Sequence, residues 1–293
     1  MMKTVAVLMA ALVPQSEPEA AVKIGQSEIE VVLPTRELAL TREQILAWVR
    51  DCGQTVAEYF GKFPVAKVRL EISAGTDGGI SGGRTWNGRL IRIQLGATAG
   101  KVDLKDDWML THEMCHLAFP DLDTKFAWIY EGCATYVEPI ARVRAGRMTP
   151  EALWKETLEG MPRGLPGPRD RGLDGTKAWG RTYWGGAYFW MKADLGIRER
   201  TKNKSSLQTA LRGILDAGGN GTEVWTVDEV IGKGDDATGT TVLRELYKEM
   251  GTAAYKPDLA ALWKQLGVER HGDEIVVDDQ APQATLRRAL TAK

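Results

Sequence analysis

The chain has 293 residues, of which 43% are hydrophobic and 26% are charged. These proportions are typical of a globular protein and exclude a disordered, collagen-like or membrane-embedded chain. Lysine and arginine together number 38, against 39 aspartates and glutamates, so the formal net charge is -1. Because no overall field attracts the protein to nucleic acid or to anionic lipid, we expect no nucleic-acid partner.

Residues 1–20 have the pattern of a secretory signal peptide. Lys3 precedes an apolar run over residues 4–13, and a polar stretch follows. The run is too short for a membrane-spanning helix, which needs about 20 apolar residues, and no comparable run occurs later, so we expect no stable membrane span. The protein is therefore predicted to be exported to the periplasm or the medium. The alternative is a cytoplasmic protein in which this segment is a buried strand.

Residues 21–150 are predicted to form a small sheet that leads into helices. A helix is expected over residues 41–60 because Thr41 is a favourable N-cap. Strands are predicted from apolar runs and apolar–polar alternation at residues 28–33, 68–72 and 89–95. The glycine-rich segment 75–88 is predicted to be a loop. Two helices follow, over residues 106–119 and 124–144, the second kinked by Pro139.

Residues 151–293 are predicted to be mostly helical and to belong to the same catalytic unit. Thr149 and Pro150 begin a helix that ends near residue 160. The glycine- and proline-rich residues that follow, up to 186, predict a long loop of the kind that often serves function. Four further helices are expected, over residues 183–195, 206–217, 240–250 and 257–266. A terminal hairpin is expected around residue 272, followed by a short helix near residue 286.

The most informative motif is formed by His112, Glu113 and His116. The chain has three histidines, and two of them stand four residues apart on a predicted helix. Residues at this spacing share one helix face, so two imidazoles can bind one zinc ion while the glutamate reaches the water on that ion. The alternative is a pair of partly buried structural histidines.

A third zinc ligand is expected on the next predicted helix, within the sequence WIYEGCATY at residues 128–136. Glu131, Thr135 and Glu138 share one face of that helix. The segment resembles the second zinc motif of the gluzincin metallopeptidases, which has a tryptophan three residues before the ligand glutamate and a glycine just after it. The resemblance implies that Glu131 is the third ligand and that Thr135 orients a ligand.

A further resemblance to gluzincin aminopeptidases lies at residues 182–187, where Tyr183 and Trp184 are followed by two glycines and an alanine. It implies that the Tyr183 hydroxyl faces the metal and stabilises the oxyanion. The resemblance also implies an α+β, thermolysin-like zincin fold in which strand 89–95 is the sheet edge that pairs with substrate. No acidic residue occurs between residues 78 and 102, so a binding site for a free substrate amine is not expected there.

We interpret the chain as a zinc metallohydrolase, and specifically as a peptidase acting on peptides or proteins. One zinc ion per chain is predicted on His112, His116 and Glu131, with the fourth position left for water. Glu113 is the predicted general base and Tyr183 the predicted oxyanion donor. Two alternatives stay open: a metal-stabilised binding or scaffold protein without turnover, and a zinc hydrolase with a non-peptide substrate.

The three cysteines, Cys52, Cys115 and Cys133, are too few and too far apart for a disulfide framework or a four-thiolate zinc site. Cys115 and Cys133 lie next to the two zinc motifs. Because this class of zinc site does not use thiolates, both are predicted to be small core residues.

Overall fold

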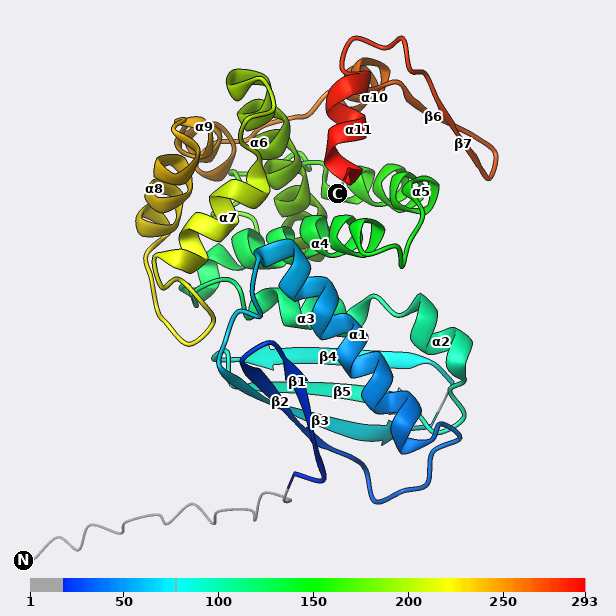
Figure 1. The fold of residues 1–293 in the computed structure, drawn as a ribbon. Coiled ribbons are helices and arrows are strands. Elements are labelled where there is room, and N and C mark those ends of the chain that lie inside the picture. The colour runs from blue at the N-terminus through cyan, green and yellow to red at the C-terminus, as the bar shows by residue number, and fades with distance from the viewer. Residues whose placement is uncertain (1–17, 77, 293) are drawn as a thin grey trace, which may run out of the picture.

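The computed structural model describes residues 18–76 and 78–292, arranged as a sheet with helices on one face and a helical half above it (Figure 1). Most of the predicted signal peptide, residues 1–17, lies outside the described residues, so export stays a prediction. Among the described helices, none is long and apolar enough to cross a membrane. The predicted α+β fold, with a small mixed N-terminal sheet and a mostly helical C-terminal half, is confirmed.

The sheet has five strands in the order β1-β2-β3-β5-β4. The two central pairs, β2 with β3 and β3 with β5, are parallel, and both outer pairs are antiparallel. The apolar residues of β3 and β5 are buried beneath the helices, while Glu71 forms ion pairs with Arg69 and Arg92 on the other face. The predicted alternation is therefore confirmed. The strands are β1 (Ala20–Ile24), β2 (Ser27–Val32), β3 (Lys67–Gly75), β4 (Ile80–Trp86) and β5 (Leu90–Gly96).

The prediction of a loop over residues 75–88 is wrong, because half of this segment is the edge strand β4. The predicted edge strand 89–95 is β5, which lies between β3 and β4. A tight turn at Asn87 and Gly88 joins the two strands, and both residues have positive φ. An Asn-Gly pair is a strong hairpin signal, but two glycines and a serine within the strand give β4 the composition of a loop.

The helices of the first half position the site. The cap at Thr41 is confirmed, since its hydroxyl accepts from the Gln44 N–H. The predicted helix 106–119 is shorter than expected, covering residues 109–116, and a separate short helix over residues 101–106 precedes it. The predicted helix 124–144 starts with a 3₁₀ turn and continues through Pro139 without ending. These elements are α1 (Arg42–Phe60), α2 (Lys101–Asp106), α3 (Met109–His116), η1 (Thr124–Phe126) and α4 (Ala127–Arg144).

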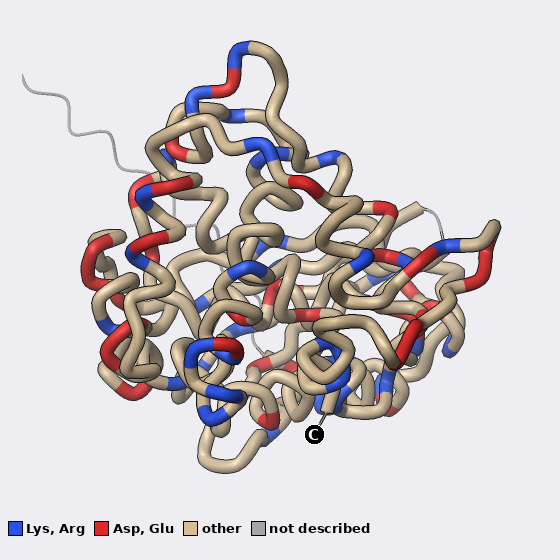
Figure 2. Tube along the Cα trace, turned by 90° about the horizontal axis from the view of Figure 1, so that it is seen from above, with Lys and Arg blue, Asp and Glu red and all other residues tan. Residues whose placement is uncertain are grey.

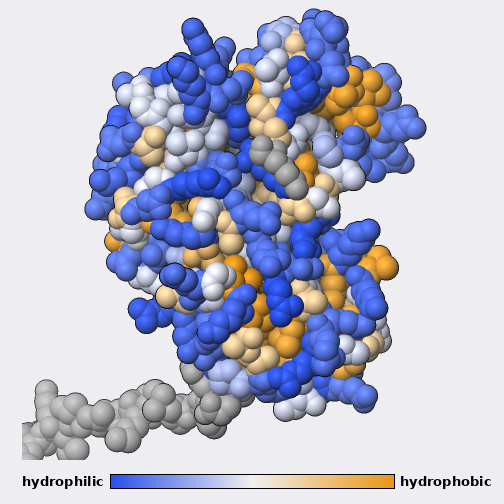
Figure 3. Space-filling view, in the orientation of Figure 1, coloured by the Kyte–Doolittle hydropathy of each residue, from blue (hydrophilic) through white to orange (hydrophobic). Residues whose placement is uncertain are grey.

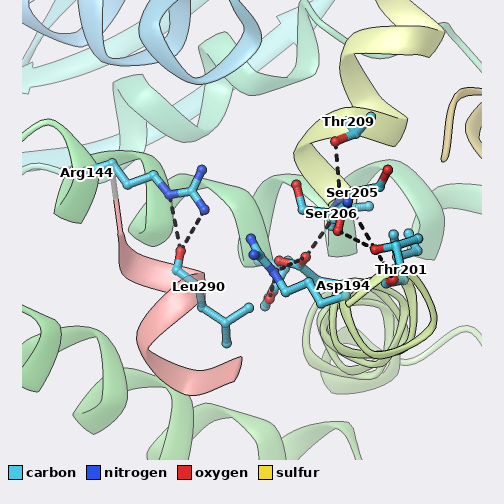
Figure 4. Close-up of polar contacts among 11 residues, drawn as sticks. Arg144, Asp194, Thr201, Ser205, Ser206, Thr209 and Leu290 are labelled. Carbon is cyan, nitrogen blue, oxygen red and sulfur yellow. Dashed lines mark hydrogen bonds and ion pairs between the residues drawn. The ribbon is translucent and has the colours of Figure 1, made fainter. Parts of the chain in front are cut away.

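The second half of the chain packs around α4. The prediction that this half is mostly helical is confirmed. Asp194, labelled in Figure 4, joins three segments. Its carboxylate accepts hydrogen bonds from Tyr136, Arg198 and the Leu207 N–H. The helix α8 was not predicted. The elements are α5 (Pro150–Gly160), η2 (Met161–Gly164), the π-helical turn η3 (Arg181–Gly185), α6 (Gly186–Thr201), α7 (Leu207–Asp216), α8 (Val227–Thr238), α9 (Val242–Leu246), the π-helical turn η4 (Tyr247–Gly251), α10 (Leu259–Leu266), β6 (Val268–His271), β7 (Glu274–Val277) and α11 (Ala284–Thr291).

Charges of both signs are interleaved along the chain (Figure 2), in keeping with the near-zero net charge. The face drawn in Figure 3 is mostly hydrophilic, with small separated apolar patches. All three cysteines are buried and free. Cys115 and Cys133 therefore belong to the core, as predicted.

Candidate active site

The predicted zinc motif lies on α3, whose first turn is fixed by a buried carboxylate. Asp107 accepts hydrogen bonds from the N–H groups of Met109 and Leu110 and from the Trp48 indole. His112 and Glu113 are buried, and His116 is partly buried. One ligand atom from each of these three side chains lies within 4.8 Å of the others, and in the described part of the chain no other group of His, Cys, Asp or Glu comes together in this way.

Glu131 reaches this group from α4. Its Oε2 atom lies 3.4 Å from Nε2 of His112 and 3.4 Å from Nε2 of His116. Two ligand atoms about 2.0–2.1 Å from a zinc ion in tetrahedral geometry are about 3.3–3.4 Å apart. The separations and the donor set, two imidazoles and one carboxylate, therefore fit a zinc ion with three protein ligands.

The glycine after Glu131 has a steric role. A Cβ atom on Gly132 would lie 2.4 Å from backbone atoms of Gly186, so α4 and α6 can cross here only without a side chain. This close crossing brings the turn that contains Tyr183 next to the ligand. The glycine that the gluzincin motif has just after the ligand glutamate is thus required here by the close contact between two helices.

The electrostatics keep Glu131 ionised. Burial alone would raise the pKa of this carboxyl, but hydrogen bonds and charge from His112 and His116 hold the pKa well below its ordinary value. Burial would lower the pKa of His116, but the hydrogen bond to Glu131 and the negative charges of Glu131 and Glu113 together outweigh that effect and raise the pKa. An ionised carboxylate between two imidazoles is the form that binds a metal cation.

Glu113 is held from the edge strand β4. The Thr85 hydroxyl lies 2.7 Å from Glu113 Oε2 and 2.8 Å from the Glu113 main-chain carbonyl oxygen, and it can donate to either. Oε1 accepts no hydrogen bond from the described residues. A Cβ atom on Gly83 would lie 2.9 Å from Glu113 Cγ and 2.8 Å from Met109 Cγ. The glycine of β4 therefore permits the strand to approach α3, and the strand in turn orients the carboxylate.

Tyr183 lies beside the histidines, in a π-helical turn that continues directly into α6. Its ring stacks on His112, with centroids 6.4 Å apart, and on Trp179, with centroids 5.4 Å apart. Burial, together with the negative charges of Glu131 and Glu113, raises the pKa of the Tyr183 hydroxyl. The group therefore stays protonated and can donate a hydrogen bond.

Thr135 does not orient a ligand through its side chain, contrary to the prediction. Its hydroxyl donates to the main-chain carbonyl of Glu131 over 2.7 Å, a bond within the helix. Glu138, on the same face, is fully buried and pairs with Arg142 over 3.0 Å. Neither side chain is available to the predicted metal.

A polar cavity of about 590 Å³ opens on the ligands. Residues of β4 line one side, and Glu113, His116 and Glu131 line another. Sequence reasoning missed two charged groups in this lining, Arg84 and Asp121. No motif marks Asp121, whose segment comes to the cavity because its backbone bonds with the distant residues 223–225.

The central part of the predicted long loop is held in place by side-chain hydrogen bonds and an ion pair. Asp174 accepts hydrogen bonds from the Trp128 indole over 2.9 Å and from the Tyr247 hydroxyl over 2.7 Å. Arg181 pairs with Asp170 over 2.8 Å, with both side chains buried. The tryptophan that precedes Glu131 by three residues therefore ties the ligand helix to the loop beside the site.

Comparison with known proteins finds no matching family model and no matching curated protein. Solved structures do match. An aminopeptidase N family protein from Idiomarina loihiensis gives a TM-score of 0.66 at 17% identity, covering 85% of this chain and 49% of that one. An M1 zinc metallopeptidase from Deinococcus radiodurans gives 0.55 at 15% identity, covering 82% and 52%.

Yeast LTA4 hydrolase gives a TM-score of 0.55 at 12% identity, covering 85% of this chain and 43% of that protein. The chain thus spans about half the length of the solved structures that it matches. At these identities the match concerns the fold, and it confirms the gluzincin fold predicted from the motifs. The chain therefore has the fold that M1 zinc metallopeptidases and LTA4 hydrolase share over about half of their length.

Proposed function

We propose that the protein is a zinc-dependent peptidase. The observation that carries the proposal is the position of Glu131 Oε2, at 3.4 Å from the Nε2 atoms of both His112 and His116, with the Glu113 carboxylate beside them. A structural zinc site is closed by four protein ligands. Here the protein supplies three ligands, and two of them, His116 and Glu131, border an open polar cavity, which favours a catalytic site.

Each residue then has a defined role. A zinc ion on the three ligands would polarise the substrate carbonyl and lower the pKa of water. Glu113 accepts the proton of the attacking water at Oε1, because the Thr85 hydroxyl lies beside Oε2, and returns it to the leaving amine. The Tyr183 hydroxyl donates a hydrogen bond to the oxygen that gains negative charge.

The edge strand β4 is the proposed docking site for substrate backbone. It pairs with β5 on one side only, and its residues 83–86, with the turn residues 87 and 88, line the polar cavity. An extended peptide can add to such an edge as a further strand. The peptide substrate is also supported by a matched M1 metallopeptidase variant from Deinococcus radiodurans that was solved with a Tyr-Ser-Ala substrate.

A peptide digest tests this function. The purified protein is incubated with a mixed peptide library, and the products are identified by mass spectrometry, with and without a metal chelator. We expect cleavage that stops on chelation and returns with zinc. If peptides stay intact while the protein holds zinc, the scaffold function or a non-peptide substrate replaces the proposal.

Cleavage is expected not to require a free substrate N-terminus. The segment from residue 78 to 102 has no acidic residue to bind an ammonium group. Acetylated and free forms of the same peptides should therefore be cleaved at similar rates. A strict need for the free amine would contradict this expectation and would point to Asp121, the cavity carboxylate from another segment, which an Asp121→Asn variant would then test.

Tyr183→Phe is expected to lower turnover by roughly 10²–10³ with little change in KM, the effect of removing one donor to an oxyanion. The ring, and with it the stacking on His112, is kept. Steady-state kinetics and zinc content are measured together. Nearly full turnover with normal zinc content would make Tyr183 a packing residue only.

Export remains part of the proposal. It is supported by the basic residue and apolar run within residues 1–20. Mass spectrometry of the N-terminus of protein from cell fractions would test it, with a processed chain outside the cytoplasm as the expected result.

A further inference from the structure

A second cavity, of about 340 Å³, borders the proposed ligand His112, which does not line the polar cavity. His112 and Tyr183 form part of its lining, and Tyr183 also lines the polar cavity. Tyr183 therefore lies between the two cavities and contributes to both linings. Because His112 is one of the proposed ligands, the second cavity lies beside the position where the cleaved bond would be held.

The lining of this cavity is mainly aromatic. Two of its tryptophans, Trp108 and Trp179, are 48% and 60% exposed. Large apolar side chains left exposed beside a cavity are characteristic of a binding surface. Deeper residues of the lining are Trp154, Trp184, Tyr136 and Met191.

The charges in the lining do not favour a charged ligand. Glu138 is paired with Arg142 over 3.0 Å, and Glu159 is paired with Arg270 over 2.6 Å. The two other charged residues of the lining, Glu156 and Arg163, have opposite signs. A ligand would therefore be selected by its size and apolar surface rather than by its charge.

The cavity is closed by the last described helix, α11. Leu290 of this helix lines the cavity and is 1% exposed. Arg144 at the end of α4 donates two hydrogen bonds to the Leu290 carbonyl, over 2.9 and 3.2 Å (Figure 4). The part of the cavity wall that α11 provides is thus held to α4 by hydrogen bonds.

We infer that this pocket, lined by Trp108, Trp154, Trp179, Trp184 and Leu290, binds a large apolar, preferably aromatic, side chain of the residue next to the cleaved bond. The inference rests on the proposed peptidase function. Thr157 of α5 lines the same pocket and is partly buried, so its substitution can fill the space without changing a ligand. The residue at position 157 therefore influences which substrate side chain fits the pocket.

The test uses acetylated peptides that differ at one position, with phenylalanine, alanine or arginine next to the cleaved bond. We expect kcat/KM to favour phenylalanine over alanine by at least roughly 10-fold, the lower end of the effect of one methylene in an apolar pocket. Thr157→Phe should abolish this preference and leave the alanine peptide unaffected. Lys155→Phe, on the same helix but outside the pocket lining, should change neither rate.

Binding provides a readout without turnover. The same peptides are titrated into the Glu113→Gln variant by calorimetry, where we expect the same order of affinity. Equal affinity for the phenylalanine and alanine peptides, or a preference for arginine, would overturn the inference while peptide cleavage by the unsubstituted protein would still support the proposed function. Tighter binding of the phenylalanine peptide without any cleavage would support the pocket and refute the peptidase.

Discussion

Replacing His116 with alanine is expected to remove zinc from the protein. The Nε2 atom of this residue lies 3.4 Å from Glu131 Oε2, so the substitution deletes one of three ligands at the centre of the site. The affinity should fall by more than the roughly 10- to 100-fold typical for loss of a hydrogen-bond partner outside the ligands. Metal analysis of protein purified without added zinc should give about one zinc per chain before the substitution and close to none after it.

His271→Ala is the matched control. His271 is the third histidine, lies exposed on β6 and pairs with Glu269, away from the site. Its removal should leave zinc content unchanged. Added zinc should stabilise the folded protein by about 2.7 kcal/mol at a concentration about 100 times Kd, and this gain should be absent in His116→Ala. Equal zinc content in all three proteins would refute the proposed metal site.

Glu113→Gln is expected to keep the zinc and to lose turnover by roughly 10²–10⁴, the usual contribution of a general base. The amide has nearly the shape of the carboxylate but cannot accept a proton from water. Because Glu113 is not one of the three proposed ligands, metal content and thermal stability should stay close to those of the unsubstituted protein. Steady-state kinetics on a verified peptide, together with metal analysis, measures both effects.

A second variant separates proton transfer from positioning. Thr85→Val removes the hydroxyl that lies 2.7 Å from Glu113 Oε2 but leaves the carboxylate in place. We expect a smaller fall in turnover than for Glu113→Gln, with zinc content unchanged. If Glu113→Gln retained most of its turnover, another group would have to act as the base, and the role given to Thr85 would also be wrong.

The zinc motif could be predicted because its geometry is local. His112 and His116 are one helical turn apart, so helix formation alone brings their side chains to one face. Glu131 needed the family resemblance, because the angle between α3 and α4 depends on packing that a single sequence does not display. The contact of Gly132 with Gly186, which sets part of that packing, becomes apparent only in the structure.

The edge strand was missed for a different reason. β4 contains few of the branched and aromatic residues that favour strands, and its stability comes from pairing with β5 and from contact with α3. The functional requirement for a close approach, shown by Gly83 against Glu113, gives the strand the composition of a loop. Asp121 was missed because its place in the cavity depends on bonds to residues far along the chain.

The position of Leu290 has a consequence for protein engineering. The residue closes the aromatic pocket from α11, an element that provides no ligand and does not contact the polar cavity. Pocket depth can therefore be varied by substitution at one end of the chain while the metal geometry, set by α3 and α4, stays as it is. Libraries randomised at this position would search for altered side-chain selectivity at little risk to the chemistry.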